Sequence, residues 1–240
     1  MSALRLALIA CDVFEEELAS HLPAEPIFVA KILLEMGLHD RPDVLRQRLQ
    51  HEIDALDAHD SLDAIVLAYA LCGRGTHGLR AGRHRLVIPR GHDCITVFLG
   101  SKERFACEQA ACPDSYYFTP GWMRGGRTPG PRRLEALRAE FSKQFDPEDV
   151  EFLLEQEREN WAQHSRAVFT DLGTPSAEGK AAEAETTAGE LGWKFDRQRG
   201  DPSLFRDLLS GKWDVDRFQI VEPGETLTHA ADERIFRSQP

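Results

Sequence analysis

The stretch LRLALIAC, residues 4–11, decides the fold class of this chain. It is an apolar run that ends at Cys11, and its length is typical of a β-strand buried on both faces, as the strands of a parallel sheet are. The segment DVFEEELASHL follows at once and predicts a helix, because its three glutamates lie where the helix dipole favours anions. A buried strand that leads directly into a helix indicates an α/β fold.

The same alternation continues along the chain. Apolar or β-prone runs predict further strands, and apolar residues at helical spacing or strong helix formers predict the helices between them. We therefore expect an α/β fold with a largely parallel sheet flanked by helices, Rossmann-like and in two lobes. The turn-rich segment GGRTPGP indicates a linker. The expected division is an N-terminal lobe at 1–124, a linker at 125–145 and a C-terminal lobe at 146–240.

Composition excludes several classes of partner. The 240-residue chain has a net charge of -11, whereas proteins that bind nucleic acids generally present a basic surface to the phosphates. No window reaches the roughly 20 apolar residues that span a bilayer, and the N-terminus lacks the features of a signal peptide. We expect a cytoplasmic protein without a nucleic-acid or membrane partner. Its five cysteines are then packed thiols, ligands or nucleophiles before they are disulfides.

Three of the predicted strands end at residues that can carry chemistry. The first ends at Cys11, the third ends at Cys72, and the fourth leads into His92, Asp93 and Cys94. In open parallel sheets, ligands bind at the carboxyl ends of the strands. If these strands are neighbours, three thiols and an imidazole gather at one edge of the sheet.

Thiolate and imidazole are the ligands that zinc and iron prefer, so the pattern predicts a metal site. Asp93 is a further ligand or orients His92. The spacing contains neither a CxxC pair nor HExxH, and the alternative is that the cysteines are small buried apolar residues. The expected ligands are Cys11, Cys72, His92 and Cys94, with His39 at the same edge.

The glycine-rich segment CGRGTHGLRAG, residues 72–82, offers a second kind of site. Its glycines, Gly73 and Gly75, let backbone N–H groups approach a phosphate or carboxylate, and Arg74 supplies positive charge. The segment matches neither of the nucleotide-binding glycine motifs, and a tight turn with solvated side chains is the alternative.

Three further residues are candidates for cofactor or substrate contacts. Ser101 places a hydroxyl near the same edge, although a helix cap is its alternative role. Tyr117 and Trp122, in SYYFTPGW, are of the kind that line apolar pockets, although an ordinary aromatic strand and turn in the core would look the same. Cys107 and Cys112 lie in a polar segment and are interpreted as incidental.

Several segments together carry a family resemblance. The chain resembles the domain-of-unknown-function family 1638 in the early strand that ends at Cys11, GLH at 37–39, LCGRGTHGL at 71–79, IPRGHDCITVFLGS at 88–101 and SYYFTPGW at 115–122. The resemblance implies that Cys11, His39, Cys72, Gly73, His92 and Cys94 form a cluster characteristic of the family. It also implies an association with corrinoid-dependent methyl transfer in bacterial and archaeal one-carbon metabolism. Arg74 and His77 depart from the plainer family form.

Three functions compete. The first is a zinc-dependent enzyme that acts on a small molecule, with Asp93 and Cys94 as catalytic residues. Its reaction would be methyl transfer in corrinoid-linked one-carbon metabolism. The second is a non-catalytic accessory protein that handles a metal or cofactor for a corrinoid or iron–sulfur partner. For the site itself, iron or an iron–sulfur cluster is the alternative to zinc. The third is a metal-free enzyme in which His92 activates the Cys94 thiolate.

Overall fold

The computed structural model describes residues 3–240, which form two compact units. Of the described residues, unit 1 comprises 3–106 and Gly200–Pro240, and unit 2 comprises Cys107–Arg199. No helix within residues 3–240 is long and apolar enough to cross a membrane.

Unit 1 is built on a five-stranded sheet with the order β2-β1-β3-β4-β8. Strand β1 pairs in parallel with β2 and β3, β3 pairs in parallel with β4, and only β8 runs antiparallel to its neighbour β4. The strands are β1 (Arg5–Cys11), β2 (Ile27–Leu34), β3 (Ala64–Ala68), β4 (Arg85–Pro89) and β8 (Phe218–Val221). The α/β fold with a largely parallel sheet is confirmed; its Rossmann-like character stays a prediction.

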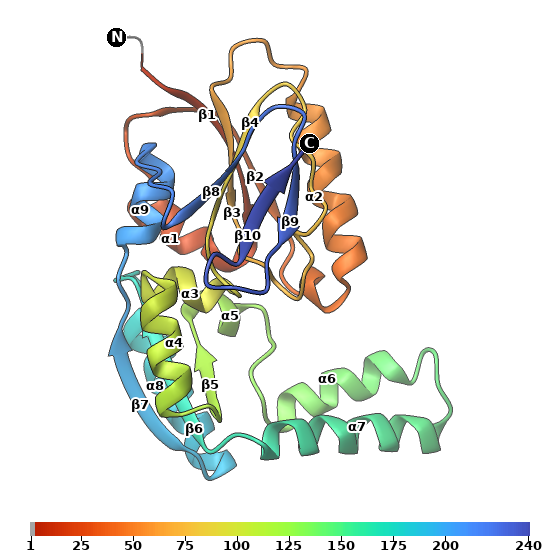
Figure 1. Cartoon of the computed structure of the whole chain (residues 1–240). Coiled ribbons are helices and arrows are strands. Elements are labelled where there is room, and N and C mark those ends of the chain that lie inside the picture. Colours follow the sequence, from red (N-terminus) through yellow and green to blue (C-terminus); the bar gives the residue numbers. More distant parts are fainter. Residues whose placement is uncertain (1–2) are drawn as a thin grey trace. The chain divides into compact units, whose positions relative to one another are not determined.

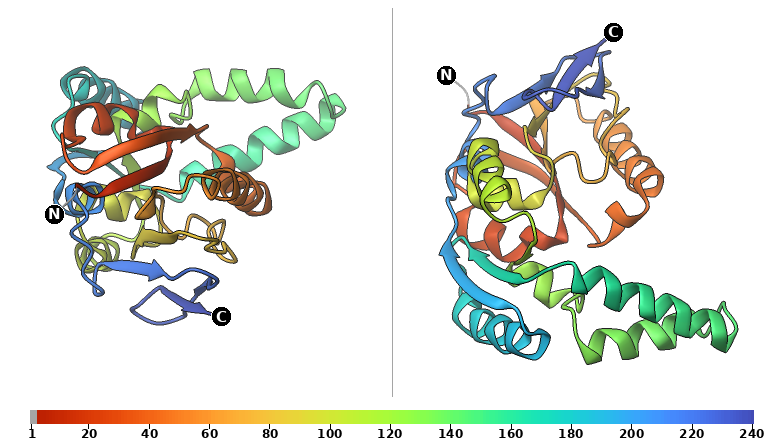
Figure 2. Two further views of the ribbon diagram at one scale, coloured as in Figure 1. Left: turned by 90° about the horizontal axis from the view of Figure 1, so that it is seen from above. Right: turned by 60° about the horizontal axis from the view of Figure 1, so that its bottom comes forward.

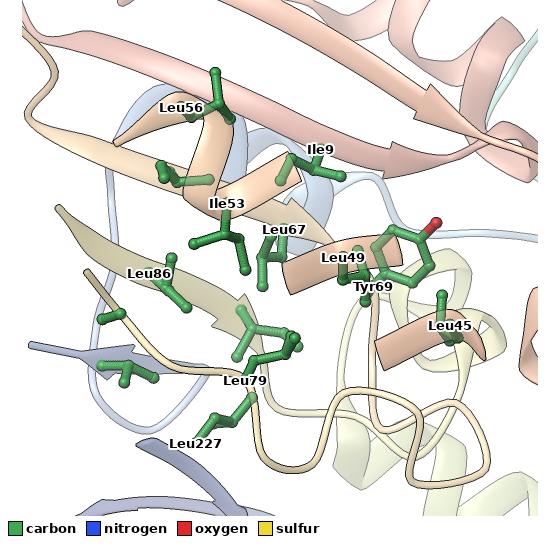
Figure 3. Close-up of a cluster of buried hydrophobic side chains, with 14 of the residues drawn as sticks. Ile9, Leu45, Leu49, Ile53, Leu56, Leu67, Tyr69, Leu79, Leu86 and Leu227 are labelled. Carbon is green, nitrogen blue, oxygen red and sulfur yellow. The ribbon is translucent and has the colours of Figure 1, made fainter. Parts of the chain in front are cut away.

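Helices cover both faces of this sheet, which explains why β1 is apolar from Leu6 to Cys11. Figure 1 shows α2 on one side of the sheet and α9 on the other. On the α2 side, Leu49 and Ile53 pack with Ile9 and Leu67 in one core (Figure 3). The helical segments of unit 1 are η1 (Asp12–Phe14), α1 (Glu15–His21), η2 (Leu38–Asp40), α2 (Pro42–Leu56), α3 (Cys94–Leu99), α9 (Ser203–Ser210) and α4 (Lys102–Ala111), which continues into unit 2.

On the opposite face, three aromatic rings from different segments stack. The ring centroid of Phe14 lies 5.1 Å from that of Phe98 and 5.2 Å from that of Phe205. A short hairpin of β9 (Thr226–His229) and β10 (Phe236–Gln239) closes the α2 side, where Leu227 and Phe236 are buried in the core.

Unit 2 contains a parallel three-stranded sheet, β5-β6-β7. Helix α8 packs on it through the buried Ala181, Ala184 and Ala188. Helices α6 and α7 lie side by side (Figure 2) and share a small core around Leu154. The elements are β5 (Ser115–Phe118), β6 (Arg166–Asp171), β7 (Lys194–Arg199), α5 (Pro120–Arg124), α6 (Pro131–Phe141), α7 (Pro147–Ala162) and α8 (Ala177–Leu191).

The division into units differs from the one expected at 1–124, 125–145 and 146–240. Helix α6 occupies much of the expected linker, and residues 200–240 belong to unit 1. The physical reason is strand pairing, because β8 completes the edge of the first sheet by hydrogen-bonding to β4. Such a return of the chain is invisible to a local reading of composition.

Candidate functional site

Three cysteines from three separate segments lie at or after the carboxyl ends of strands in unit 1. Cys11 is the last residue of β1, Cys72 lies in the loop after β3, and Cys94 is the first residue of α3. Burial raises the pKa of Cys72 to about 12, and the nearby Cys11 and Asp93 add to this shift. Burial also raises the pKa of Cys94 well above its usual range, with contributions from Asp93, Cys72 and Cys11. These three residues are called the thiol cluster.

The strand order explains why the cluster forms. Strands β1 and β3 are neighbours, but the chain leaves β1 toward β2 and leaves β3 toward β4, in opposite directions across the sheet. Such a divergence opens a crevice at the carboxyl ends of the two strands, where open α/β sheets bind ligands. Cys11 and Cys72 therefore flank the position in this sheet that most favours a ligand.

Strained backbone holds the glycine-rich loop beside the cluster. Cys72, Gly73 and Arg74 have φ angles of 47°, 63° and 70°. The two residues with side chains pay a conformational cost on the order of 1 kcal/mol each, because left-handed backbone suits glycine. Hydrogen bonds compensate: the Cys72 N–H donates to the His92 carbonyl over 2.9 Å, and the Gly75 N–H donates to the Cys72 carbonyl over 3.0 Å.

These bonds bear on the predicted roles of the loop. They tie the end of β3 to the segment after β4, so Cys72 is fixed beside the His92–Cys94 segment. The N–H groups of Cys72 and Gly75 are occupied by carbonyls of the chain itself. An anion cradle at Gly73, Arg74 and Gly75 therefore stays a prediction, without these two donors.

The two histidines of the predicted ligand set lie in the segments that flank the cluster. A Cβ on Gly73 would lie 3.3 Å from the His39 carbonyl oxygen, so the His39 segment packs directly on the glycine loop. The His39 Nε2 lies 3.4 Å from the Asp40 carboxylate, and His92 is exposed. Within residues 3–240, no three His, Cys, Asp or Glu side chains are grouped as a preformed metal site, so metal ligation stays a prediction.

Asp93 and Ser101 both cap helices. The Asp93 Oδ1 accepts a hydrogen bond of 3.3 Å from the Thr96 N–H at the start of α3. Burial raises the pKa of Asp93, although the hydrogen bonds that its carboxylate accepts from backbone N–H groups and the charge of His92 oppose this shift. The Ser101 Oγ accepts a bond of 3.1 Å from the Arg104 N–H and so caps α4. Asp93 thus fixes the first turn of the helix that carries Cys94.

A pocket of about 710 Å³ opens beside His92. Its walls come from the start of α4 and from the β9–β10 turn, and they include Lys102, Phe105 and His229. The Lys102 Nζ donates to the Glu233 carbonyl over 2.8 Å and so ties the two walls together. A small molecule in this pocket would contact His92, which directly precedes Asp93 and Cys94 in the chain. We call it the His92 pocket.

Tyr117 and Trp122 belong to unit 2, on β5 and α5. The Trp122 ring packs against the core of that unit, and the Arg127 guanidinium lies 5.3 Å from the ring centroid. This agrees with the alternative interpretation of SYYFTPGW as part of a core. A role for Tyr117 and Trp122 as the wall of a binding pocket stays a prediction.

Tyr69 is a site residue that the sequence reasoning missed. It follows β3 directly, is 3% exposed, and its hydroxyl has no hydrogen-bond partner in the described structure. Tyr69 lies in the same core as Ile9 and Leu67 (Figure 3), and Cys11 and Cys72 pack against this core. Burial, followed by the charges of Cys11 and Cys72, raises the pKa of Tyr69. The available signal was a phenol within the otherwise apolar run AIVLAYAL, residues 64–71.

Comparisons with known proteins assign the chain to a family but identify no relative of known activity. No curated protein matches the chain, and no solved structure matches it. Residues 33–209 match the family described as "Protein of unknown function (DUF1638)". The match includes Cys72, His92 and Cys94, whereas Cys11 lies outside it. Because the match covers most of the chain, the protein belongs to the DUF1638 family.

Proposed function

We propose that the protein is a metal-dependent enzyme that acts on a small molecule, with zinc held by Cys11, Cys72 and Cys94. The observation that carries this proposal is the convergence of three thiols from separate segments at the carboxyl ends of β1, β3 and β4. Three soft ligands suit zinc or iron and leave a coordination position for substrate. The fit is one of donor chemistry, since the described side chains form no preformed metal geometry.

The residues of the chain have separate roles in this proposal. The thiol cluster holds the ion, which supplies Lewis acidity or a nucleophile at neutral pH when it is bound. Asp93 keeps the first turn of α3 in place and so positions Cys94. His92 and Lys102 line the pocket in which the substrate binds.

The pKa directions weigh against the metal-free alternative. A thiolate is the reactive form of cysteine, and burial raises the pKa values of Cys72 and Cys94. Both groups are therefore neutral thiols at neutral pH unless a cation displaces their protons. The His92 pocket in turn favours an enzyme over the accessory protein, because a metal handler needs no space for a substrate.

The finer assignment is methyl transfer with a corrinoid protein as partner, in the cytoplasm. The methyl transfer and the corrinoid partner follow from the family resemblance. The methyl transfer is tested by the absorbance of methylcobalamin mixed with the purified protein and a thiol acceptor. Demethylation that requires the protein supports it, and an unchanged spectrum contradicts it.

The metal proposal is tested by elemental analysis of protein purified without oxygen or chelator. Wild type should carry zinc, or iron in its place, at one ion per chain, and Cys72→Ser and Cys94→Ser should lose it. Cys107→Ser is the matched control because Cys107 is exposed and outside unit 1. Full metal occupancy in both site variants, or no metal in wild type, would refute the proposal.

A further inference from the structure

Arg90 is a buried arginine whose side chain hydrogen-bonds only to neutral groups within the described residues. It is 6% exposed and follows β4 directly. Its Nε donates to the Val215 carbonyl over 2.9 Å, and its Nη1 donates over 2.7 Å to the carbonyls of both Arg234 and Phe236. Its Nη2 donates to the Gln219 Oε1 over 2.9 Å. These bonds hold the segments around β8 and β10 on the end of β4.

The charge of this guanidinium is left without a direct counter-ion. In proteins, buried charges are ordinarily paired with an opposite charge. Here burial lowers the pKa of Arg90, the Arg234 charge lowers it further, and Asp216 and Asp232 oppose the shift without bonding to the group. A guanidinium has five N–H donors, and four are used, so one N–H of Nη2 remains for a ligand.

Arg90 lies in the wall of a pocket of about 480 Å³. Arg234 and Arg237 line the same pocket, with the Gln219 amide and the Ser238 hydroxyl. The residues that line it include no aspartate or glutamate, although the chain as a whole carries a net charge of -11. The positive charges of three arginines thus converge on one cavity of an acidic protein.

Carboxylates outside the pocket compete for this charge, as Asp216 and Asp232 do at Arg90. Asp232 forms an ion pair with Arg237, and both side chains are largely exposed. Exposed ion pairs contribute little free energy because water and salt screen them. An anion in the pocket can therefore take Arg237 from Asp232 at small cost.

We propose that this cavity, the Arg90 pocket, binds an oxyanion of the phosphate class. The planar forks of arginine match the oxygen geometry of phosphate. The cavity is larger than a phosphate ion, so it has room for the organic part of a phosphomonoester. It lies at the carboxyl end of β4, the edge at which open α/β sheets bind ligands. The proposal does not depend on the thiol cluster.

The test is isothermal titration of the full chain with inorganic phosphate, methyl phosphate and acetate. The variant is the double substitution Arg234→Gln with Arg237→Gln, since both side chains are exposed and Arg90 keeps its bonds. Arg83→Gln is the matched control, an exposed arginine of the same unit paired with Asp60. Phosphate affinity should fall at least about tenfold in the double variant and stay unchanged in the control.

Each outcome of the titration decides the proposal. Tighter binding of methyl phosphate indicates a phosphomonoester, and tighter binding of inorganic phosphate indicates the free ion. Equal affinity for acetate would show that the pocket is not selective for phosphate and would overturn the proposal. Absence of phosphate and methyl phosphate binding by wild type, or equal binding by the double variant, would overturn it as well.

Discussion

The substitution Tyr69→Phe tests whether the hydroxyl beside the thiol cluster is reserved for a ligand. A buried tyrosine usually makes a hydrogen bond, and its loss on substitution costs about 1 kcal/mol of stability. The Tyr69 hydroxyl has no partner and is 3% exposed. An unpaired buried polar group instead destabilises the folded state, by about 1–3 kcal/mol. The aromatic ring stays in place, so the substitution creates no cavity.

The expected result in ligand-free protein is therefore a gain in stability. A gain of about 1 kcal/mol corresponds to a rise in Tm of about 2–4 °C for a chain of this size. The assay is urea and thermal unfolding, followed by circular dichroism, with a chelator present. Thr76→Val is the control, because the buried Thr76 hydroxyl donates a hydrogen bond to the Ala70 carbonyl over 3.0 Å, and this variant should lose about 1 kcal/mol.

The sign of the change in stability decides whether the Tyr69 hydroxyl is held for a ligand. If Tyr69→Phe loses stability as the control does, the hydroxyl is bonded in the folded protein and is not held for a ligand. If Tyr69→Phe also loses metal in the elemental analysis, the phenol is part of the coordination itself. A stabilised variant with unchanged metal content is the result that we expect.

Three further predictions concern single side chains. In metal-free protein near pH 8.5, which is about the ordinary pKa of a thiol, iodoacetamide should label the exposed Cys107 and spare Cys72, because burial raises the pKa of Cys72 to about 12. Mass spectrometry measures the labelling of both residues, and fast labelling of Cys72 would contradict this prediction. Burial lowers the pKa of His77, so near pH 6.5, about the ordinary histidine pKa, the unfolded chain binds more protons than the folded chain. The free energy of unfolding should therefore fall as pH falls through that value. His77→Gln should remove this pH dependence from urea unfolding curves, and a pH profile that the substitution leaves unchanged would contradict the prediction. Gly100→Ala should lower the free energy of unfolding by more than about 2 kcal/mol in urea unfolding, because φ at Gly100 is 86° and the new Cβ would lie 2.6 Å from the Cβ of Asp201. Gly126→Ala should lower it less, because φ there is 66° but no atom lies within contact distance of the new Cβ. Equal losses in the two variants would show that the contact with Asp201 does not destabilise the protein.

Much of the fold follows from local pattern. The run that ends at Cys11 is apolar because β1 is covered on both faces, and the spacing of Leu45, Leu49 and Ile53 follows from the single buried face of α2. Hydrophobic periodicity is a property of neighbouring residues, so a sequence displays it directly. The positions of Cys11 and Cys72 at strand ends were visible for the same reason.

The tertiary structure decided what depends on distant partners. It placed β1 beside β3, which brings Cys11 and Cys72 to one crevice, and it returned β8 to β4, which contradicts a simple division into N- and C-terminal lobes. It also showed the unpaired hydroxyl of Tyr69 and the charge of Arg90 without a counter-ion. Hydrogen-bond partners and strand order arise from contacts between residues far apart in the chain. Local pattern cannot encode them, because the free energy that selects them appears only when those segments pack together.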